Sequence, residues 1–298
     1  MRRMVKIKYM TRPREHGRAA VRMEGMRRRF VGELIGAYLL VMIGTSSVAA
    51  AAITGAQVGL WQVAVVWTLG VSLAIYATAN ISGAHLNPAV TLAFAIFRRE
   101  DFDYRLIPLY WTAQLAGSIF AGLTVLGIFG PAIARFEAEN GIVRGAAGSQ
   151  RSAMVFGEYF PNPAIYGAGE AAAELISPLG ALFVEGFGTA ILALSIFALT
   201  DKRNTGLTGN LAPLLIGATV GALISLFAPL TQGGWNPARD FGPRIVAYFA
   251  GWESIAIPGP SEGFWIYILG PLIGAPVGAA VYHFLLKPGL GQGSGEES

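Results

Sequence analysis

The sequence predicts an all-α membrane protein of six transmembrane helices and two re-entrant half-helices, arranged as an inverted repeat. Three observations lead to this fold class: a shortage of charge, six apolar blocks long enough to span a bilayer, and one motif that occurs twice. Charged residues make up 13% of the 298 residues and apolar residues 53%, whereas soluble domains carry about 25% charge. A soluble chain of this length would need more charge to cover its surface, so composition alone indicates a membrane protein.

The apolar residues gather in blocks of roughly the length that crosses a bilayer as a helix, about 20 residues. Glycine, proline or charged residues bound each block. The first block follows basic residues, as a signal peptide does, but its apolar stretch is too long for a signal and a matching segment recurs later. We therefore interpret it as a retained span. The six predicted spans are 30–53, 60–80, 104–129, 178–199, 211–230 and 263–286.

The distribution of basic residues predicts the orientation. Eleven of the 22 Lys and Arg residues precede the first span, and such a segment stays in the cytoplasm. Six spans then return the C-terminus to the cytoplasm and leave the long connection 130–177 outside. We therefore expect a multi-pass protein of the cell membrane, plasma or inner, whose basic pI of 9.4 reflects topology and contact with anionic lipid, not nucleic acid. Met26 is an alternative start, in which case residues 1–25 are an extension.

An internal repeat decides the architecture. The segment that begins at Glu33 resembles the one that begins at Glu185, and the run Gly83–Ala89 resembles Gly233–Ala238, at offsets that nearly coincide. The two halves, approximately 30–129 and 178–287, carry three spans each. Because three is odd, the second copy must lie upside down relative to the first. Inverted repeats of this kind place the functional site near the midplane, between the halves.

Each half also contains a segment too short and too interrupted to cross, 81–97 and 231–249. Both segments begin with small and turn-forming residues and then become apolar, as re-entrant half-helices do. Non-helical backbone at membrane depth is tolerated only where it is buried in protein or lines a water-filled cavity. Two such segments, entering from opposite faces, therefore predict a pore.

An Asn-Pro-Ala tripeptide stands in each re-entrant segment. Asn is a favoured helix N-cap and Pro is favoured at the first helical position, so a single copy would indicate a helix start and nothing more. Two copies in register favour a function. With its oxygen capping the helix, each Asn amide is free to donate to a permeating oxygen, and the two helix N-termini, each with about +0.5 charge, oppose cations and protons. The residues are Asn87, Pro88, Ala89, Asn236, Pro237 and Ala238.

The runs Ser82–Thr91 (SGAHLNPAVT) and Asn236–Arg244 (NPARDFGPR) resemble the signature loops of the aquaporin and glycerol facilitator family. The similarity extends over about residues 30–287, so a basic N-terminal segment, 1–29, and a C-terminal tail, 288–298, lie outside it. The resemblance implies a homotetramer with one pore per subunit and facilitated diffusion of small uncharged solutes. It implies no catalytic residue, cofactor or metal.

The family resemblance also assigns a selectivity filter. Arg239 follows the second Asn-Pro-Ala at a depth where a charged side chain is expensive and usually functional. In the family this arginine forms one wall of the narrowest constriction, donates to solute oxygens and adds to cation exclusion. Trp67 in the second span matches the position of the second wall. A tryptophan there is typical of the solute-conducting branch, because its apolar face can carry the carbon backbone of a polyol.

The two remaining filter positions depart from the glycerol facilitators. They correspond to Ile224 in the fifth span and Gly233 in the second re-entrant loop, whereas facilitators have glycine in the span and a large aromatic in the loop. We therefore expect a broad pore that passes glycerol, urea, water and metalloid acids, and one that Gly233→Phe would narrow. Asp240 and the outer-loop run Tyr159–Pro163 also resemble the solute-conducting branch, and Asp240 can pair with Arg244 across one turn.

Supporting roles are expected for the polar residues that lie in apolar segments. Glu33 and Glu185 occupy equivalent places, and we interpret them as braces that accept hydrogen bonds from the re-entrant loops. His85 and Gln114 are interpreted as loop and packing residues. Small residues would let the spans approach closely, namely Gly117, Gly122, Gly274 and Gly278.

Four other functions remain as alternatives. An intramembrane enzyme would need a nucleophile beside a base, and with no Cys and three His residues the sequence offers no such constellation. A proton-coupled transporter could share the inverted repeat, and flux that ignores a pH gradient would exclude it. An ion channel is disfavoured because acidic pore rings are missing from the sequence. A predominantly water-conducting channel is the nearest alternative.

Overall fold

The computed structural model describes residues 15–204 and 209–290, and this part of the chain is helical and without a β-strand. Six segments within these ranges are long and apolar enough to cross a membrane, which confirms the predicted fold class. The helices that cross are α1 (Glu15–Ala52), α2 (Leu60–Ser82), α4 (Ile107–Glu139), α8 (Pro178–Leu199), α10 (Ala212–Thr231) and α12 (Ile266–Val281). The half-helices are α3 (Pro88–Phe97) and α11 (Pro237–Ala247).

Shorter helical segments complete the fold, and three of them lie in the long connection between the halves. That connection contains α5 (Gln150–Ala153), α6 (Pro163–Tyr166) and α7 (Glu170–Ala173). Single turns of 3₁₀ or π-helix adjoin the longer helices, at η1 (Tyr104–Leu106), η2 (Gly209–Leu211), η3 (Tyr248–Trp252), η4 (Glu253–Ile255), η5 (Pro260–Trp265), η6 (Tyr282–Leu286) and η7 (Lys287–Gly289).

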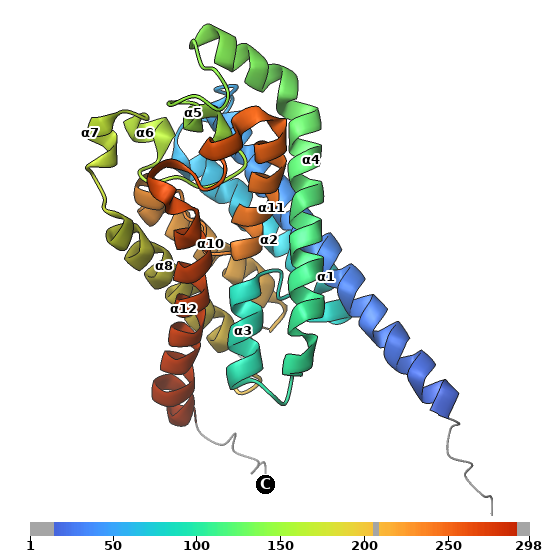
Figure 1. Ribbon diagram of the computed structural model, residues 1–298. Coiled ribbons are helices and arrows are strands. Elements are labelled where there is room, and N and C mark those ends of the chain that lie inside the picture. Colours follow the sequence, from blue (N-terminus) through green and yellow to red (C-terminus); the bar gives the residue numbers. More distant parts are fainter. Residues whose placement is uncertain (1–14, 205–208, 291–298) are drawn as a thin grey trace, which may run out of the picture.

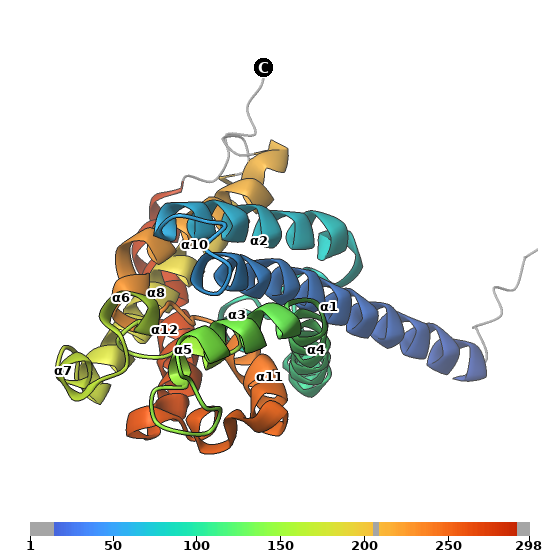
Figure 2. The same ribbon diagram turned by 90° about the horizontal axis from the view of Figure 1, so that it is seen from above.

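Two helix boundaries differ clearly from the expected ones. Helix α1 begins at Glu15, so the later part of the basic segment 1–29 continues the first span instead of preceding it. The start of α1 extends beyond the other helices in both views (Figures 1 and 2). Helix α4 continues through Pro131 to Glu139, beyond the predicted end of the span at residue 129. Residues 1–14 and the tail beyond residue 290 lie outside the described chain.

The packing of the helices follows the inverted repeat. Helix α1 packs on α2 and α4, and its counterpart α8 packs on α10 and α12, while α2 and α10 meet each other across the halves. The half-helices are exchanged: α3 of the first half packs on α12, and α11 of the second half packs on α4. Each half therefore encloses the re-entrant segment of the other.

The two ends of the bundle differ. The start of α1 and the end of α12 lie at one end, which we call the terminal face, and the connection with α5, α6 and α7 lies at the other, the loop face (Figure 1). Within each half the close approach of two helices depends on glycine. A methyl group added at Gly117 of α4 would collide with the Leu34 carbonyl of α1, and one added at Gly274 of α12 would collide with the Gly186 carbonyl of α8.

Candidate functional site

The two half-helices begin at the two Asn-Pro-Ala turns. Asn87 is extended, with φ −154° and ψ 122°, and its side-chain oxygen accepts a hydrogen bond from the Ala89 amide at 2.9 Å. Asn236 has nearly the same backbone, and its oxygen accepts from Ala238 at 3.1 Å and from Arg239 at 3.2 Å. Both turns therefore form the capped helix start that the tripeptide favours, with proline in the first turn.

The carboxamide nitrogens of the two asparagines join the halves. Asn87 Nδ2 donates to the carbonyl oxygen of Trp235 at 2.8 Å, and Asn236 Nδ2 donates to that of Leu86 at 2.9 Å. Each carbonyl belongs to the residue that precedes the other asparagine. A carboxamide nitrogen carries two hydrogens, so one on each side chain remains for a solute. The expectation that the nitrogens are wholly free is therefore corrected to one donor each.

A single cavity of about 840 Å³ passes the two turns and reaches residues near both faces of the bundle. Gln57, Phe136 and Arg151 border it toward the loop face, and Thr200 and Pro213 border it toward the terminal face. Asn87 and Asn236 both border the same cavity, as do all four predicted filter residues, Trp67, Ile224, Gly233 and Arg239. The structure thus brings the predicted pore residues together from both halves.

Glu33 lies in α1 and holds the first re-entrant loop. Its carboxylate accepts hydrogen bonds from the backbone amides of His85 at 3.0 Å and Leu86 at 2.7 Å, and from the Ser82 hydroxyl at 2.7 Å. Leu86 has a φ of +53°, a conformation that costs energy for a residue with a side chain. The carboxylate therefore satisfies buried amides and fixes the strained turn that leads into Asn87.

Glu185 of α8 holds the second re-entrant loop in the same way. Its carboxylate accepts from the amides of Gly234 at 3.1 Å and Trp235 at 2.8 Å, and the side chain is fully buried in α8. Trp235, with a φ of +42°, is the counterpart of Leu86. The two glutamates thus occupy equivalent positions in the repeat and neither borders the cavity, although residues of both loops that they hold do.

His85 and Gln114 lie beside the first brace. The His85 ring packs among Phe94, Phe102 and Tyr110, with ring centroids 4.5 to 5.0 Å apart, and its side chain also borders the cavity. Gln114 Nε2 donates to Glu33 at 2.7 Å and is fully buried. Both residues contribute to the support of the loop.

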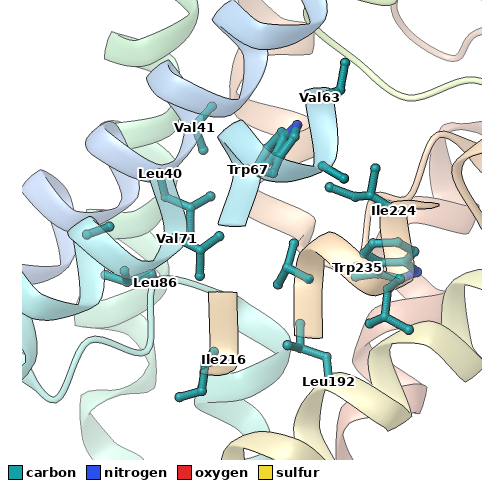
Figure 3. Packing of buried hydrophobic residues seen from close by; sticks show 14 of the residues in the cluster. Leu40, Val41, Val63, Trp67, Val71, Leu86, Leu192, Ile216, Ile224 and Trp235 are labelled. Carbon is teal, nitrogen blue, oxygen red and sulfur yellow. The ribbon is translucent and has the colours of Figure 1, made fainter. Parts of the chain in front are cut away.

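Arg239 and Trp67, two of the expected filter residues, lie together at one corner of the cavity. The guanidinium carbon lies 4.9 Å from the Trp67 ring centroid, and Nη1 donates to the Phe156 carbonyl at 3.2 Å. Trp67 reaches this place because Gly44 of α1 leaves room for its ring. Figure 3 shows Trp67 of α2 and Ile224 of α10 projecting into one packed cluster. The corner thus combines hydrogen-bond donors with an apolar surface.

Glu158 is the charged residue that sequence reasoning missed. Its carboxylate lies 2.5 Å from Nη2 of Arg239, and only 2–3% of either side chain is exposed. Burial raises the pKa of Glu158 to about 7. The residue stands in the same loop as Tyr159–Pro163, which the sequence singled out, but only the fold reveals that this loop returns to the filter.

Asp240 and Arg244 attach that loop to α11. Asp240 Oδ1 accepts from the Glu158 amide at 2.7 Å, and its other oxygen accepts from Arg244 Nε at 2.6 Å, one turn along the helix as expected. Arg244 also donates to the carbonyls of Ala256, at 2.8 Å, and Glu158. Asp240 lies outside the cavity lining and positions Glu158 from behind.

The family model described as Major intrinsic protein matches residues 20–282 of this chain. The glycerol uptake facilitator protein of Pseudomonas aeruginosa is 42% identical over 258 residues, which cover 86% of this chain and 88% of that protein. The glycerol uptake facilitator protein of Escherichia coli K12 is 40% identical over 258 residues, which cover 86% of this chain and 87% of that protein.

Two further similarities extend these. The propanediol uptake facilitator PduF of Citrobacter freundii is 37% identical over 269 residues, which cover 90% of this chain and 95% of that protein. The X-ray structure of the aquaglyceroporin from Plasmodium falciparum aligns with a TM-score of 0.73 at 27% identity, covering 89% of this chain and 98% of that one.

Proposed function

This chain belongs to the major intrinsic protein family, and we infer that it is a passive channel through which glycerol and other small uncharged solutes cross a membrane. It is a multi-pass membrane protein and a channel, not an enzyme. The observation that carries this function is the one cavity that both Asn-Pro-Ala turns and all four filter residues border, between residues of the two faces. The similarity to proteins described as glycerol and propanediol uptake facilitators supports the proposal that small polyols and diols are the solutes.

The cavity offers a solute one polar side and one apolar side. The side chains of Arg239, Asn87 and Asn236 present hydrogen-bond donors, each asparagine through its one remaining N–H. Trp67 and Ile224 present apolar surface. A polyol fits this division because its hydroxyls project from a chain of carbons, and it passes from donor to donor without any bond being formed or broken.

Exclusion of cations rests on the centre of the cavity. The N-termini of α3 and α11 meet there through the two asparagines, and each helix end carries about +0.5 charge. At the filter, Glu158 offsets the charge of Arg239, so the field that opposes cations and protons is strongest at the asparagines. This differs from the expectation that Arg239 adds to cation exclusion.

The setting of the channel follows from sequence and family. The loop face lies outside and the terminal face in the cytoplasm, because the basic residues concentrate before the first span. The membrane is the cell membrane, plasma or inner. The assembly is a homotetramer with one pore per subunit, which is consistent with exposed apolar side chains such as Phe183 on α8 and Phe249.

Stopped-flow light scattering on reconstituted vesicles tests the function. We expect flux of glycerol and propane-1,2-diol well above that of empty vesicles, with urea, water and boric acid, a metalloid acid, measured in the same preparation. At a fixed outside pH, the flux should be the same with and without a pH gradient, and planar bilayers should show no conductance. High water flux with glycerol flux at the level of empty vesicles would support the water channel instead. Flux that depends on the gradient would support a coupled transporter.

A further inference from the structure

Gly233 leaves a space in the filter that another residue fills. A Cβ atom added to Gly233 would lie 2.6 Å from Cη2 of Trp235 and 2.9 Å from its Cζ2 and Cζ3. The benzene part of the Trp235 indole therefore lies directly against the glycine. Trp235 borders the cavity and is only 2% exposed. The space is occupied although the residue that the family resemblance assigns to this wall has no side chain.

Three contacts fix the position of Trp235. Its amide donates to Glu185 at 2.8 Å, and its carbonyl accepts from Asn87 at 2.8 Å. The five-membered part of the indole lies against Gly188 of α8, where any added Cβ would collide with Nε1. The indole N–H has no acceptor among the described residues. Shape, not a polar contact, therefore holds the ring, and its carbon surface is what it can offer to the cavity.

The first half of the repeat provides a comparison. Leu86 is the counterpart of Trp235, since both precede an Asn-Pro-Ala turn and both carbonyls accept from an asparagine of the other half. A Cβ added at Gly36 of α1 would collide with the Leu86 side chain, as one added at Gly188 would collide with Trp235. The same glycine slot thus receives a leucine in one half and an indole in the other. The second half, which carries the filter, has the bulkier wall.

We propose that Trp235 forms the second aromatic wall of the filter, in the space beside Gly233, and that it is a specificity-determining residue for solute width. This inference rests on the proposed channel function. Trp67 and Ile224 belong to the same buried cluster as Trp235 (Figure 3), and all three residues border the cavity, so they give the filter three apolar walls. Such a filter selects unbranched polyols and diols of about three carbons, whose hydroxyls face one way, and it slows longer or bulkier polyols.

Substitution of Trp235 with a solute series of increasing length tests the proposal. Glycerol, erythritol and ribitol, with three, four and five carbons, are compared in reconstituted vesicles. We expect Trp235→Ala to raise the ratio of ribitol flux to glycerol flux at least about fivefold, and Trp235→Met to raise it less. Trp61→Ala is the matched control, since Trp61 is 70% exposed on α2. An unchanged ratio in folded Trp235→Ala and Trp235→Met would overturn the proposal.

A second measurement does not need the alanine variant to fold. The chain has no cysteine, so Trp235→Cys introduces a single thiol. We expect Hg²⁺ to block glycerol flux through Trp235→Cys, and Trp61→Cys to remain open. Undiminished glycerol flux through Trp235→Cys after treatment with Hg²⁺ would show that residue 235 does not line the filter. Failure of the channel function itself has a different outcome, because the unmodified protein would then show no glycerol flux.

Discussion

The carboxylate of Glu158 lies 2.5 Å from the guanidinium of Arg239, and the pair is buried where the loop between the halves meets the filter. Two residues of α11 hold the backbone of Glu158. Asp240 accepts a hydrogen bond from its amide, and Arg244 donates one to its carbonyl. Two positive and two negative side chains therefore share one buried cluster. Its charge is balanced only while Glu158 is ionised.

Glycerol flux should depend on the pH outside through Glu158. Because burial raises its pKa to about 7, the carboxylate is protonated below that pH and ionised above it. Protonation weakens the bond to Arg239 and frees the guanidinium to bind solute more tightly, which slows passage. We expect flux to fall about twofold from pH 8 to pH 6. Glu158→Gln should show the low value throughout, as measured by stopped flow.

The control for this prediction is Glu170→Gln, which changes an exposed glutamate of the same loop. It should retain the pH dependence of the unmodified protein. A Glu158→Gln channel that still loses flux on acidification would show that another group titrates.

Asn87→Ala should weaken both the fold and the function. The variant loses the cap of α3 and the bond to the Trp235 carbonyl, so we expect the free energy of unfolding to fall by about 2 kcal/mol. Glycerol flux should fall as well, because one of the two central donors is gone. Thermal unfolding in detergent and vesicle flux measure the two effects. Asn140→Ala, in which the asparagine is exposed at the end of α4 and bonds the Phe136 carbonyl and Arg151, should cost much less stability and leave the flux unchanged.

Glu185→Ala should destabilise the second re-entrant loop. It leaves the amides of Gly234 and Trp235 buried without an acceptor, and we expect a loss of about 3 kcal/mol in the free energy of unfolding. The exposed Glu174 provides the control, since Glu174→Ala should stay within about 0.5 kcal/mol of the unmodified protein. Equal unfolding temperatures for the two variants would contradict the bracing role.

Gly233→Phe should not simply narrow the range of solutes, as its position in the sequence suggested. Gly233 has a φ of +84°, which a side chain adopts only with strain, and the Trp235 ring already occupies the adjoining space. We expect lower flux for every solute and a free energy of unfolding reduced by at least about 1 kcal/mol. Shortening Trp235 in the same chain should recover part of the flux. Full stability of Gly233→Phe alone would show that the loop rearranges freely.

Much of this architecture could be predicted because its signals are local. The spans follow from runs of apolar residues, and the half-helix starts follow from Asn-Pro at the cap. The repeat related Glu33 to Glu185 before any contact was known. The family resemblance also assigned the four expected filter positions, which border one cavity, Trp67 and Ile224 among them.

The contacts that could not be predicted join residues far apart in the chain. The hydrogen bonds between Asn87 and Trp235 and between Asn236 and Leu86 join residues 148 and 150 positions apart. A periodic pattern of residues along one helix cannot predict contacts at such separations. Glu158 was one acidic residue among several in the loop until the fold placed it on Arg239. The family resemblance assigns the filter wall to Gly233, which has no side chain. The ring that fills the space beside Gly233 belongs to Trp235, two residues along the loop.

The exchange of half-helices between the halves has a consequence for biogenesis. Helix α3 is made early, yet the surface that covers it, α12, and the carbonyl that receives Asn87 belong to the part of the chain translated last. Until these parts of the second half are in place, the first Asn-Pro-Ala turn is not covered by protein on that side. A chain that ends before α12 therefore leaves α3 uncovered on the side where α12 packs.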